Sequence, residues 1–231
     1  MMTSSRPFTV IDCDQRSDQW KAARLGRLTG SVAAEAFATT QKGAWSADRK
    51  NLRTRLVLER LTNQPQERQV GGYQVRDGIA REPMARYTYE CLTGTVVRQC
   101  GFISDNEIPI GASPDGYLGD FEGLVSIKSP IAATHLATLT VYRQQQKAET
   151  PGPASLVVPI EYLHQIRHEL YCTGSSWCDY VSFHPAFPPS LQLVMVRVAR
   201  TDVDLAAYEG LVRDFLAEVD AEYVKVMEMA S

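Results

Sequence analysis

The 231-residue chain is 44% hydrophobic and 22% charged, a composition that supports one ordinary globular core. Its longest apolar runs, such as Leu156 to Ile160, fall far short of the roughly 20 residues that span a bilayer. The N-terminus has no apolar segment after a basic start, which argues against a secretory signal. The five cysteines include no C-x-x-C pair and fit neither a disulfide framework nor a zinc site. We therefore expect a soluble cytoplasmic protein without a membrane partner.

The charge balance is slightly acidic. The formal net charge is −3 and the pI is about 5.8, which argues mildly against a nucleic-acid binder. Basic residues nevertheless cluster in one short segment between Arg49 and Arg60. That segment is either a surface for DNA or a solvated helix face with alternating charge.

Hydrophobic spacing predicts four helices in the first part of the chain, at 16–26, 29–40, 46–63 and 76–94. Ser17 or Asp18 is placed to cap the first of them, and Gly26 to stop it. Pro83 either opens the regular part of the fourth helix or kinks it. Gly94 occupies the position after the last turn, where a left-handed backbone commonly ends a helix.

After residue 94 the pattern changes from helical to extended. Three short segments rich in β-branched residues predict a strand meander, at 95–104, 108–118 and 123–129. Further helices are predicted at 132–147 and 160–172, and further strands at 176–185 and 190–200. The chain ends in a helix at 202–229, capped by Thr201 or Asp202. This order indicates an α+β fold in which a sheet is flanked by helices.

Two side chains at one end of the predicted hairpin suit phosphodiester hydrolysis. With Mg²⁺, that reaction needs oxygen ligands for the ion and a cation for the developing charge. Asp115 precedes one strand and Lys128 ends the next, so the two would meet at the same end. Each alone also has a structural explanation, as a turn residue and as a lysine at a strand end.

Four motifs occur in order along the chain: RLGRLTGS at 24–31, GIAREPMAR at 78–86, SPDG at 113–116 and SIKSP at 126–130. Together they resemble the phage-type alkaline exonucleases, the family of lambda exonuclease and the YqaJ viral recombinases within the PD-(D/E)xK nuclease superfamily. The resemblance extends from about Trp20 to Tyr171.

The resemblance implies a restriction-endonuclease-like core with a central mixed β-sheet flanked by helices. It divides a single exonuclease domain, 1–231, into N-terminal helices at 16–62, a nuclease core at about 77–200 and the C-terminal helix at 202–229. The implied activity is a Mg²⁺-dependent 5′→3′ exonuclease, with Mn²⁺ as a substitute ion, that degrades one strand of linear double-stranded DNA for phage-type recombination.

The same resemblance implies the partners. Relatives form homotrimeric rings at DNA ends and work beside a single-strand annealing protein, which places this protein in a bacterial host as a phage or prophage product. A ring whose channel is lined with basic side chains would reconcile DNA binding with the acidic net charge.

The resemblance also assigns roles to residues. Asp115 and the backbone carbonyl of Ile127 would bind the metal, and Lys128 would orient the water or stabilise the transition state. Glu82 would lie at the edge of the active site, and Gln165 corresponds to a glutamine of the following helix.

Arg24 and Ser31 belong to an N-terminal element that handles a DNA phosphate in the family. A guanidinium and a hydroxyl at a helix start suit that task, because free amides there favour anions. The alternative is an arginine at a helix C-terminus and a serine that caps the next helix.

Ser126 departs from the family motif, which has Glu at this position. A serine hydroxyl is an uncharged and poor ligand for Mg²⁺, and Asp115 is then the motif's only carboxylate. Three explanations stay open: an engineered substitution, a natural and catalytically impaired clamp that only binds DNA ends, and relocation of the acid to another element.

Relocation resembles the arrangement in some restriction endonucleases of the superfamily, which have Ser-x-Lys and an acid on a neighbouring helix. Here Glu161, Gln165 and Glu169 lie on one face of the helix predicted at 160–172. We expect Glu161 to be the relocated catalytic acid and metal ligand, with Glu169 as the second candidate. The alternative for either is an exposed glutamate on an amphipathic helix.

Overall fold

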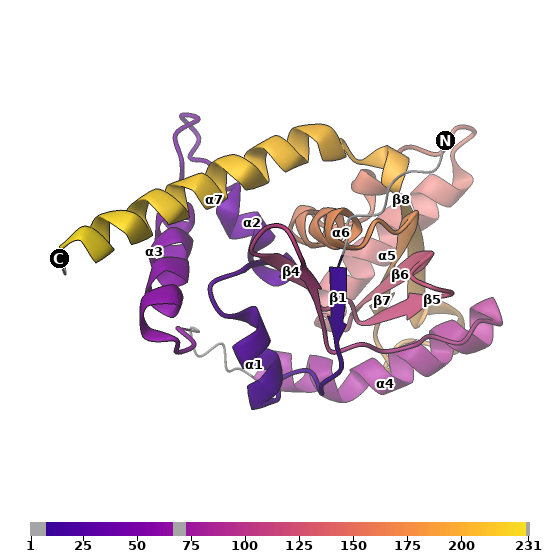
Figure 1. Cartoon of the computed structure of the whole chain (residues 1–231). Helices are drawn as coiled ribbons and strands as arrows, with labels where there is room; N and C mark the ends of the chain where they lie inside the picture. Colours follow the sequence, from indigo (N-terminus) through magenta and orange to yellow (C-terminus); the bar gives the residue numbers. More distant parts are fainter. Residues whose placement is uncertain (1–7, 67–72, 230–231) are drawn as a thin grey trace.

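The computed structural model describes residues 8–66 and 73–229 and contains two four-stranded sheets with helices around them (Figure 1). The strands are β1 (Phe8–Ile11), β2 (Leu28–Thr29), β3 (Phe102–Asp105), β4 (Ile110–Ala112), β5 (Gly116–Leu118), β6 (Gly123–Lys128), β7 (Trp177–Phe183) and β8 (Leu193–Ala199). The helices are α1 (Asp18–Arg24), α2 (Ala33–Ala36), α3 (Ala47–Thr62), α4 (Tyr73–Thr93), α5 (Ala132–Lys147), α6 (Ile160–Thr173) and α7 (Leu205–Glu228). None of these helices is long and apolar enough to cross a membrane.

The larger sheet has the strand order β5-β6-β7-β8 and is mixed. Strand β6 pairs in parallel with β7, while the β5–β6 and β7–β8 pairs are antiparallel. Parallel neighbours need a crossover of a dozen or more residues. Helices α5 and α6 form that crossover, which brings α6 onto the sheet next to β6.

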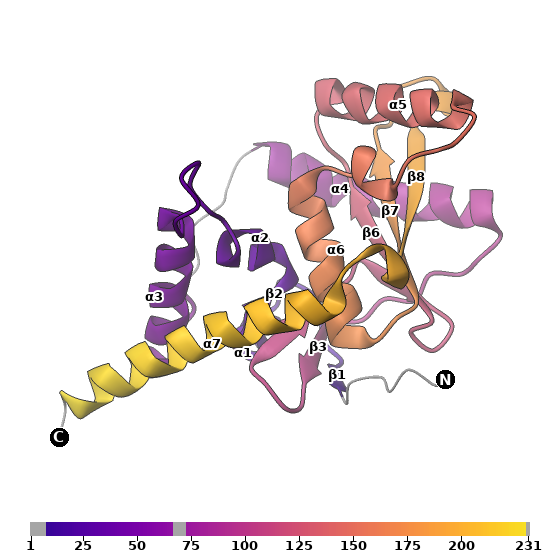
Figure 2. The ribbon, with the colours of Figure 1, turned by 90° about the horizontal axis from the view of Figure 1, so that it is seen from above.

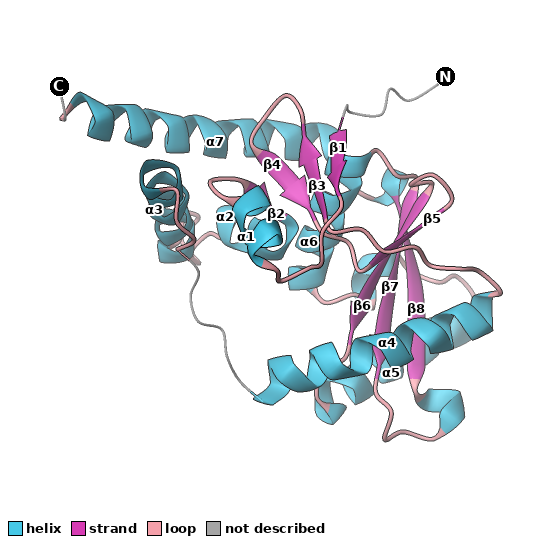
Figure 3. Cartoon of the chain, turned by 60° about the horizontal axis from the view of Figure 1, so that its bottom comes forward, coloured by secondary structure: helices cyan, strands magenta, loops and turns pink. Residues whose placement is uncertain are grey.

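The two faces of β6 contact different helices. Leu124 packs in one cluster with apolar side chains of α6, and Val125 packs in another with side chains of α4. Figure 3 shows α4 running across β6, β7 and β8. Because alternate side chains of a strand point to opposite faces, Ser126 and Lys128 share the α6 face with Leu124.

The smaller sheet, of order β1-β3-β4-β2, packs with α3, α6 and α7 in the largest apolar cluster. Figure 2 shows α7 extending from the neighbourhood of α6 to α3. Strand β1, which the sequence did not predict, pairs antiparallel with β3 at the edge of this sheet. Its four residues, FTVI, are all aromatic or β-branched, so the sequence carried a short strand signal that was missed.

The basic segment of α3 is engaged within the fold. Arg49 and Arg53 form ion pairs with Glu218 of α7, at 2.7 and 3.3 Å, and Arg60 forms one with Asp220 at 2.5 Å. Arg49 is 2% exposed. These arginines therefore join α3 to α7. Arg49 is buried, so it does not belong to a solvated helix face, which was the alternative interpretation of this segment.

The expected three-strand meander is wrong. The segment predicted as one strand at 108–118 forms β4 in the smaller sheet and β5 in the larger sheet. Pro114 lies between the two strands, lacks an N–H for a ladder and accepts a hydrogen bond from Gln15 Nε2 on its carbonyl at 3.2 Å. The fold thus has two mixed sheets instead of one, while the α+β class with flanking helices is confirmed.

The helix ends follow local side-chain chemistry. Ser17 caps α1 as predicted, by accepting a backbone N–H of the first turn. Helix α4 continues through Pro83. The C-terminal helix begins later than predicted and is capped by Asp204, because residues 200–202 form a short 3₁₀ turn; the predicted caps Thr201 and Asp202 are wrong. The division of the chain into three parts of one domain stays a prediction.

Candidate active site

Asp115 and Lys128 meet at the open end of the β5–β6 hairpin. The last pair of that hairpin joins Gly116 to Val125, so the end of β6 extends beyond β5. The Asp115 carboxylate takes the place of a strand partner there, because its Oδ2 accepts the Ile127 N–H at 2.7 Å. Lys128 Nζ lies 3.7 Å from the same oxygen. The carboxylate and the ammonium therefore face each other, as the hairpin pattern predicted.

Helix α6 adds a buried carboxylate. Glu169 is 1% exposed, and its Oε1 accepts a hydrogen bond from Gln165 Nε2 at 2.8 Å. Its Oε2 is buried, and no hydrogen-bond donor in residues 8–66 or 73–229 reaches it; the same holds for the Oγ of Ser126 on β6. A buried carboxylate oxygen without a partner is energetically costly. The arrangement is one that a cation would complete.

Glu82 borders this cluster from α4. Its carboxylate forms ion pairs with Arg86 at 2.6 Å and with Arg16 at 3.8 Å. The φ of Arg16 is 73°, a left-handed value that is uncommon for residues other than glycine, and its side chain is 52% exposed. The solvent-accessible guanidinium of Arg16 therefore lies beside the carboxylate of Glu82.

The ionisable groups act on one another. Burial raises the pKa of Glu169 to about 7, although the charge of Lys128 opposes this rise and that of Asp115 adds to it. Burial and then the charge of Asp115 also raise the pKa of Glu82. Burial lowers the pKa of Lys128, but Asp115 and Glu169 outweigh burial and the net shift is upward. Lys128 therefore remains an ammonium at neutral pH.

The segment from Arg24 to Ser31 lies beside α6. A Cβ built on Gly30 would be 3.4 Å from the Cγ of Gln165 and 3.5 Å from the Cγ of Glu169, so this backbone is in contact range of both side chains. Arg24 Nη2 donates to the exposed Oγ of Ser31 at 3.1 Å. A guanidinium and a hydroxyl held together next to the carboxylates suit a phosphate oxygen.

Residues 19–176 match the YqaJ-like viral recombinase domain family, and this stretch is more than half of the chain. The chain belongs to that family. The resemblance inferred from the four motifs is thereby confirmed.

Solved structures share the fold of this family member. The alkaline exonuclease LHK-Exo from Laribacter hongkongensis has a TM-score of 0.76 at 33% sequence identity, over 93% of this chain and 98% of that chain, and LHK-Exo in complex with dAMP gives the same values. A phage-related exonuclease from Haemophilus somnus 129PT has a TM-score of 0.63 at 13% identity, over 89% of this chain and 96% of that chain, and shows the fold alone. A comparison with curated proteins gave no match.

Most residues that the sequence singled out surround one end of the larger sheet: Asp115, Lys128, Gln165 and Glu82. Glu161 differs from them in its exposure to solvent. It is exposed in the first turn of α6, beside Ile160, which is 63% exposed, whereas Glu169 is buried near Lys128 at the other end of the helix. The structure thus places the two candidates differently, because the helix face that carries both glutamates is exposed at Glu161 and buried at Glu169. The catalytic roles themselves stay predictions.

The oxygen donors at this site fit a hard divalent cation. No group of three His, Cys, Asp or Glu side chains in the described part of the chain is arranged to hold a metal. The protein would contribute the carboxylates of Asp115 and Glu169 together with the Ile127 carbonyl. Mg²⁺ commonly binds through one or two carboxylates and keeps several waters, so this set is sufficient. The unpartnered Oε2 of Glu169 supports the fit.

Two features near the site were missed from the sequence. One is Arg16, for which the sequence carries no signal that we recognise. The other is Glu59 of α3, whose Oε2 accepts the Gly26 N–H at 2.9 Å, while Arg60 Nε donates to the Gly26 carbonyl at 3.1 Å. These two hydrogen bonds hold Gly26, in the loop before β2, against α3. Glu59 follows Leu56 by three residues on the buried face of α3, and a charge at this spacing was a usable signal.

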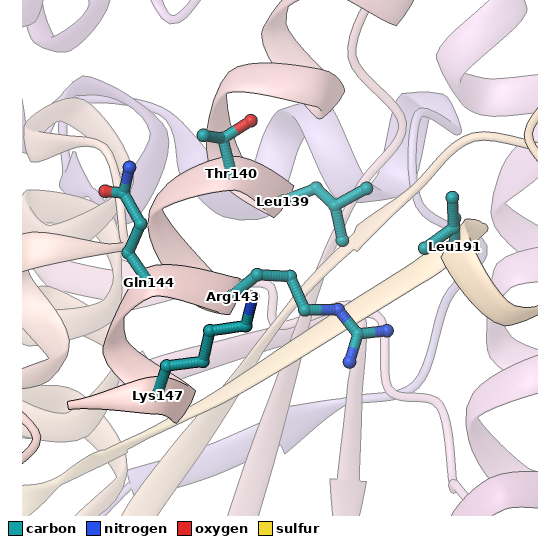
Figure 4. A pocket seen from close by; sticks show the side chains of 6 residues that line it. All are labelled: Leu139, Thr140, Arg143, Gln144, Lys147 and Leu191. Atoms are coloured by element: carbon teal, nitrogen blue, oxygen red, sulfur yellow. The ribbon is translucent and has the colours of Figure 1, made fainter. Parts of the chain in front are cut away.

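A separate hollow lies beside α5 (Figure 4). It is lined by side chains of α5 and by one residue of the turn before β8: Leu139, Thr140, Arg143, Gln144, Lys147 and Leu191. None of the candidate catalytic residues lines it, so it plays no part in the chemistry proposed below.

Proposed function

We propose that this protein is a Mg²⁺-dependent exonuclease that degrades one strand of linear double-stranded DNA in the 5′→3′ direction for recombination by single-strand annealing. The observation that carries the proposal is the contact between Asp115 and Lys128 at the end of β6, in a chain of the YqaJ-like family whose fold matches an alkaline exonuclease. The structure of LHK-Exo with dAMP supports a deoxynucleoside monophosphate as the released product.

The residues of the site divide the chemistry among them. When bound, Mg²⁺ supplies a Lewis acid for the phosphate and lowers the pKa of a bound water; Mn²⁺ supplies the same. Asp115 and the carbonyl of Ile127 would hold the ion. Lys128, an ammonium next to Asp115, would stabilise the negative charge that develops on the attacked phosphate. Arg24 and Ser31 would bind a neighbouring DNA phosphate.

The proposal includes a homotrimeric ring around the DNA, a single-strand annealing protein as partner, and a bacterial host that carries the phage or prophage. The resemblance to ring-forming relatives supports the first two, and membership in a viral recombinase family supports the third. Sedimentation at micromolar concentration should give three times the chain mass of 25.7 kDa. A monomer under those conditions would contradict the ring.

A catalytically impaired clamp that binds DNA ends is the second candidate function. The observation that favours it is Ser126, which is 0% exposed and leaves the α6 face of β6 without a carboxylate. Such a clamp would bind duplex ends with strong salt dependence and would release no nucleotides.

Linear duplex labelled at either the 5′ or the 3′ end separates these functions. The exonuclease should release labelled mononucleotide early from the 5′-labelled strand in Mg²⁺, should release none in EDTA, and should leave circular duplex intact. Binding without release in Mg²⁺ or Mn²⁺ would identify the clamp. Early release of the 3′ label would overturn the proposed polarity.

A further inference from the structure

We propose that Glu169 of α6 is the second carboxylate ligand of the metal site, in place of the acid that Ser126 does not provide. The inference rests on the proposed nuclease function and assigns a ligand within it. It moves the expected acid from strand β6 to the helix that packs on that strand.

Ser126 and Glu169 belong to one interface. The face of β6 that carries Ser126 also carries Leu124 and Lys128. Leu124 packs in a cluster with three apolar residues of α6, namely Leu163, Ile166 and Leu170. Lys128 Nζ lies 5.4 Å from the ring centroid of Tyr162 on α6 and 3.7 Å from Asp115 Oδ2. Helix α6, which carries Glu169, therefore packs on the face of β6 that carries Ser126.

One oxygen of the Glu169 carboxylate accepts a hydrogen bond, and the other has no partner among the described residues. Gln165 donates to Oε1 at 2.8 Å, and the backbone at Gly30 lies against the side chains of both residues. Within the described ranges, Oε2 has no hydrogen-bond partner although it is buried, and Ser126 Oγ is in the same state. Buried charged groups persist when they are paired or coordinate a metal. Lys128 already pairs with Asp115, so the unused oxygen is left for a cation.

Charge and ligand number agree with this assignment. With the ion bound and both carboxylates ionised, Asp115 and Glu169 would bring two negative charges to the site, and Lys128 would bring one positive charge. A divalent ion bound by two carboxylates and completed by waters is a common Mg²⁺ arrangement. Glu161 offers no comparable placement, because it is exposed in the first turn of α6.

The test measures Mn²⁺ binding to the full-length protein in the absence of DNA, by isothermal titration calorimetry. Glu169→Gln should bind Mn²⁺ at least about tenfold more weakly than the unmodified protein, because the charge of one ligand is lost. Glu161→Gln on the same helix should bind normally. The exchange Ser126→Glu with Glu169→Ser should bind within about tenfold of the unmodified protein, because it returns an acid to the same interface from β6.

Unchanged Mn²⁺ affinity in Glu169→Gln, or loss of affinity in Glu161→Gln, would overturn the inference. Circular dichroism and thermal unfolding establish whether each variant is folded. If Glu169→Gln is unfolded, the double variant Ser126→Glu with Glu169→Ser decides. Failure of that folded double variant to bind Mn²⁺ would then overturn the inference. If the unmodified protein digests DNA while Glu169→Gln keeps its metal affinity, the inference fails and the proposed function stands. If the unmodified protein binds no Mn²⁺ and digests no DNA, both fail.

Discussion

Replacing Tyr89 with Phe should destabilise the protein by about 2 kcal/mol, because it removes one hydrogen bond to a buried charged group. Tyr89 on α4 is 1% exposed, and its hydroxyl donates to Asp179 Oδ2 at 2.8 Å. Asp179 on β7 is 0% exposed and accepts two further hydrogen bonds from Arg197, from Nε at 2.8 Å and from Nη2 at 3.0 Å. Because Phe keeps the buried ring and Arg197 still pairs with the carboxylate, the loss is confined to one hydrogen bond.

Thermal and urea unfolding measure this loss. For a chain of this size, about 1 kcal/mol corresponds to a shift in Tm of roughly 2–4 °C, so Tyr89→Phe should unfold roughly 4–8 °C lower. The matched control is Tyr87→Phe on the same helix, where the side chain is 67% exposed and the change should stay within about 0.5 kcal/mol. Equal stability of the two variants would refute the claim that the Tyr89–Asp179 bond anchors α4, which carries Glu82, to the sheet.

Two other predictions concern pH and DNA. Burial lowers the pKa of His168 to about 4, so this residue is neutral in the folded protein, whereas the unfolded chain protonates it near its ordinary value of 6.5. The contribution of His168 to stability should therefore be full above pH 6.5 and should be lost, by on the order of 3 kcal/mol, as the pH drops to about 4. Urea unfolding over this range should show a smaller loss in His168→Gln than in the unmodified protein; equal losses would contradict the prediction. Arg24→Ala should weaken DNA binding for all sequences and reduce the slope of log affinity against log salt by about 1. Fluorescence anisotropy at several salt concentrations measures that slope, and an unchanged slope would remove Arg24 from the phosphate contacts.

Local features of the fold were predictable from the sequence because they depend on neighbouring residues. Ser17 caps α1 by contacting its own first turn, and Gly94 has a φ of 67° that few other residues adopt easily. The proximity of Asp115 and Lys128 was also predictable, since it follows from one short hairpin. Periodicity, caps and hairpins all act over a few residues, so one sequence is enough to reveal them.

Long-range packing was not predictable in the same way. Glu161 and Glu169 share a helix face, and periodicity cannot tell which end of that helix is buried. The burial of the C-terminal end depends on distant partners: His168 next to Glu169 makes hydrogen bonds to Tyr208 of α7 and Gly111 of β4. Likewise, nothing local in 108–118 shows that its two halves pair in different sheets. Strand pairing is decided by residues far along the chain.

The single-turnover rate of DNA digestion by Asp115→Asn tests the central claim most directly. This substitution keeps the shape of the side chain and an oxygen for the Ile127 N–H but removes the charge that would hold Mg²⁺ next to Lys128. Asp120→Asn, an exposed change in the turn of the same hairpin, is the matched control. With enzyme in excess over 5′-labelled linear duplex in Mg²⁺, Asp115→Asn should be at least about 100-fold slower than the unmodified protein, and Asp120→Asn about equal to it. Digestion by folded Asp115→Asn at the unmodified rate would show that this site is not where the DNA is cut.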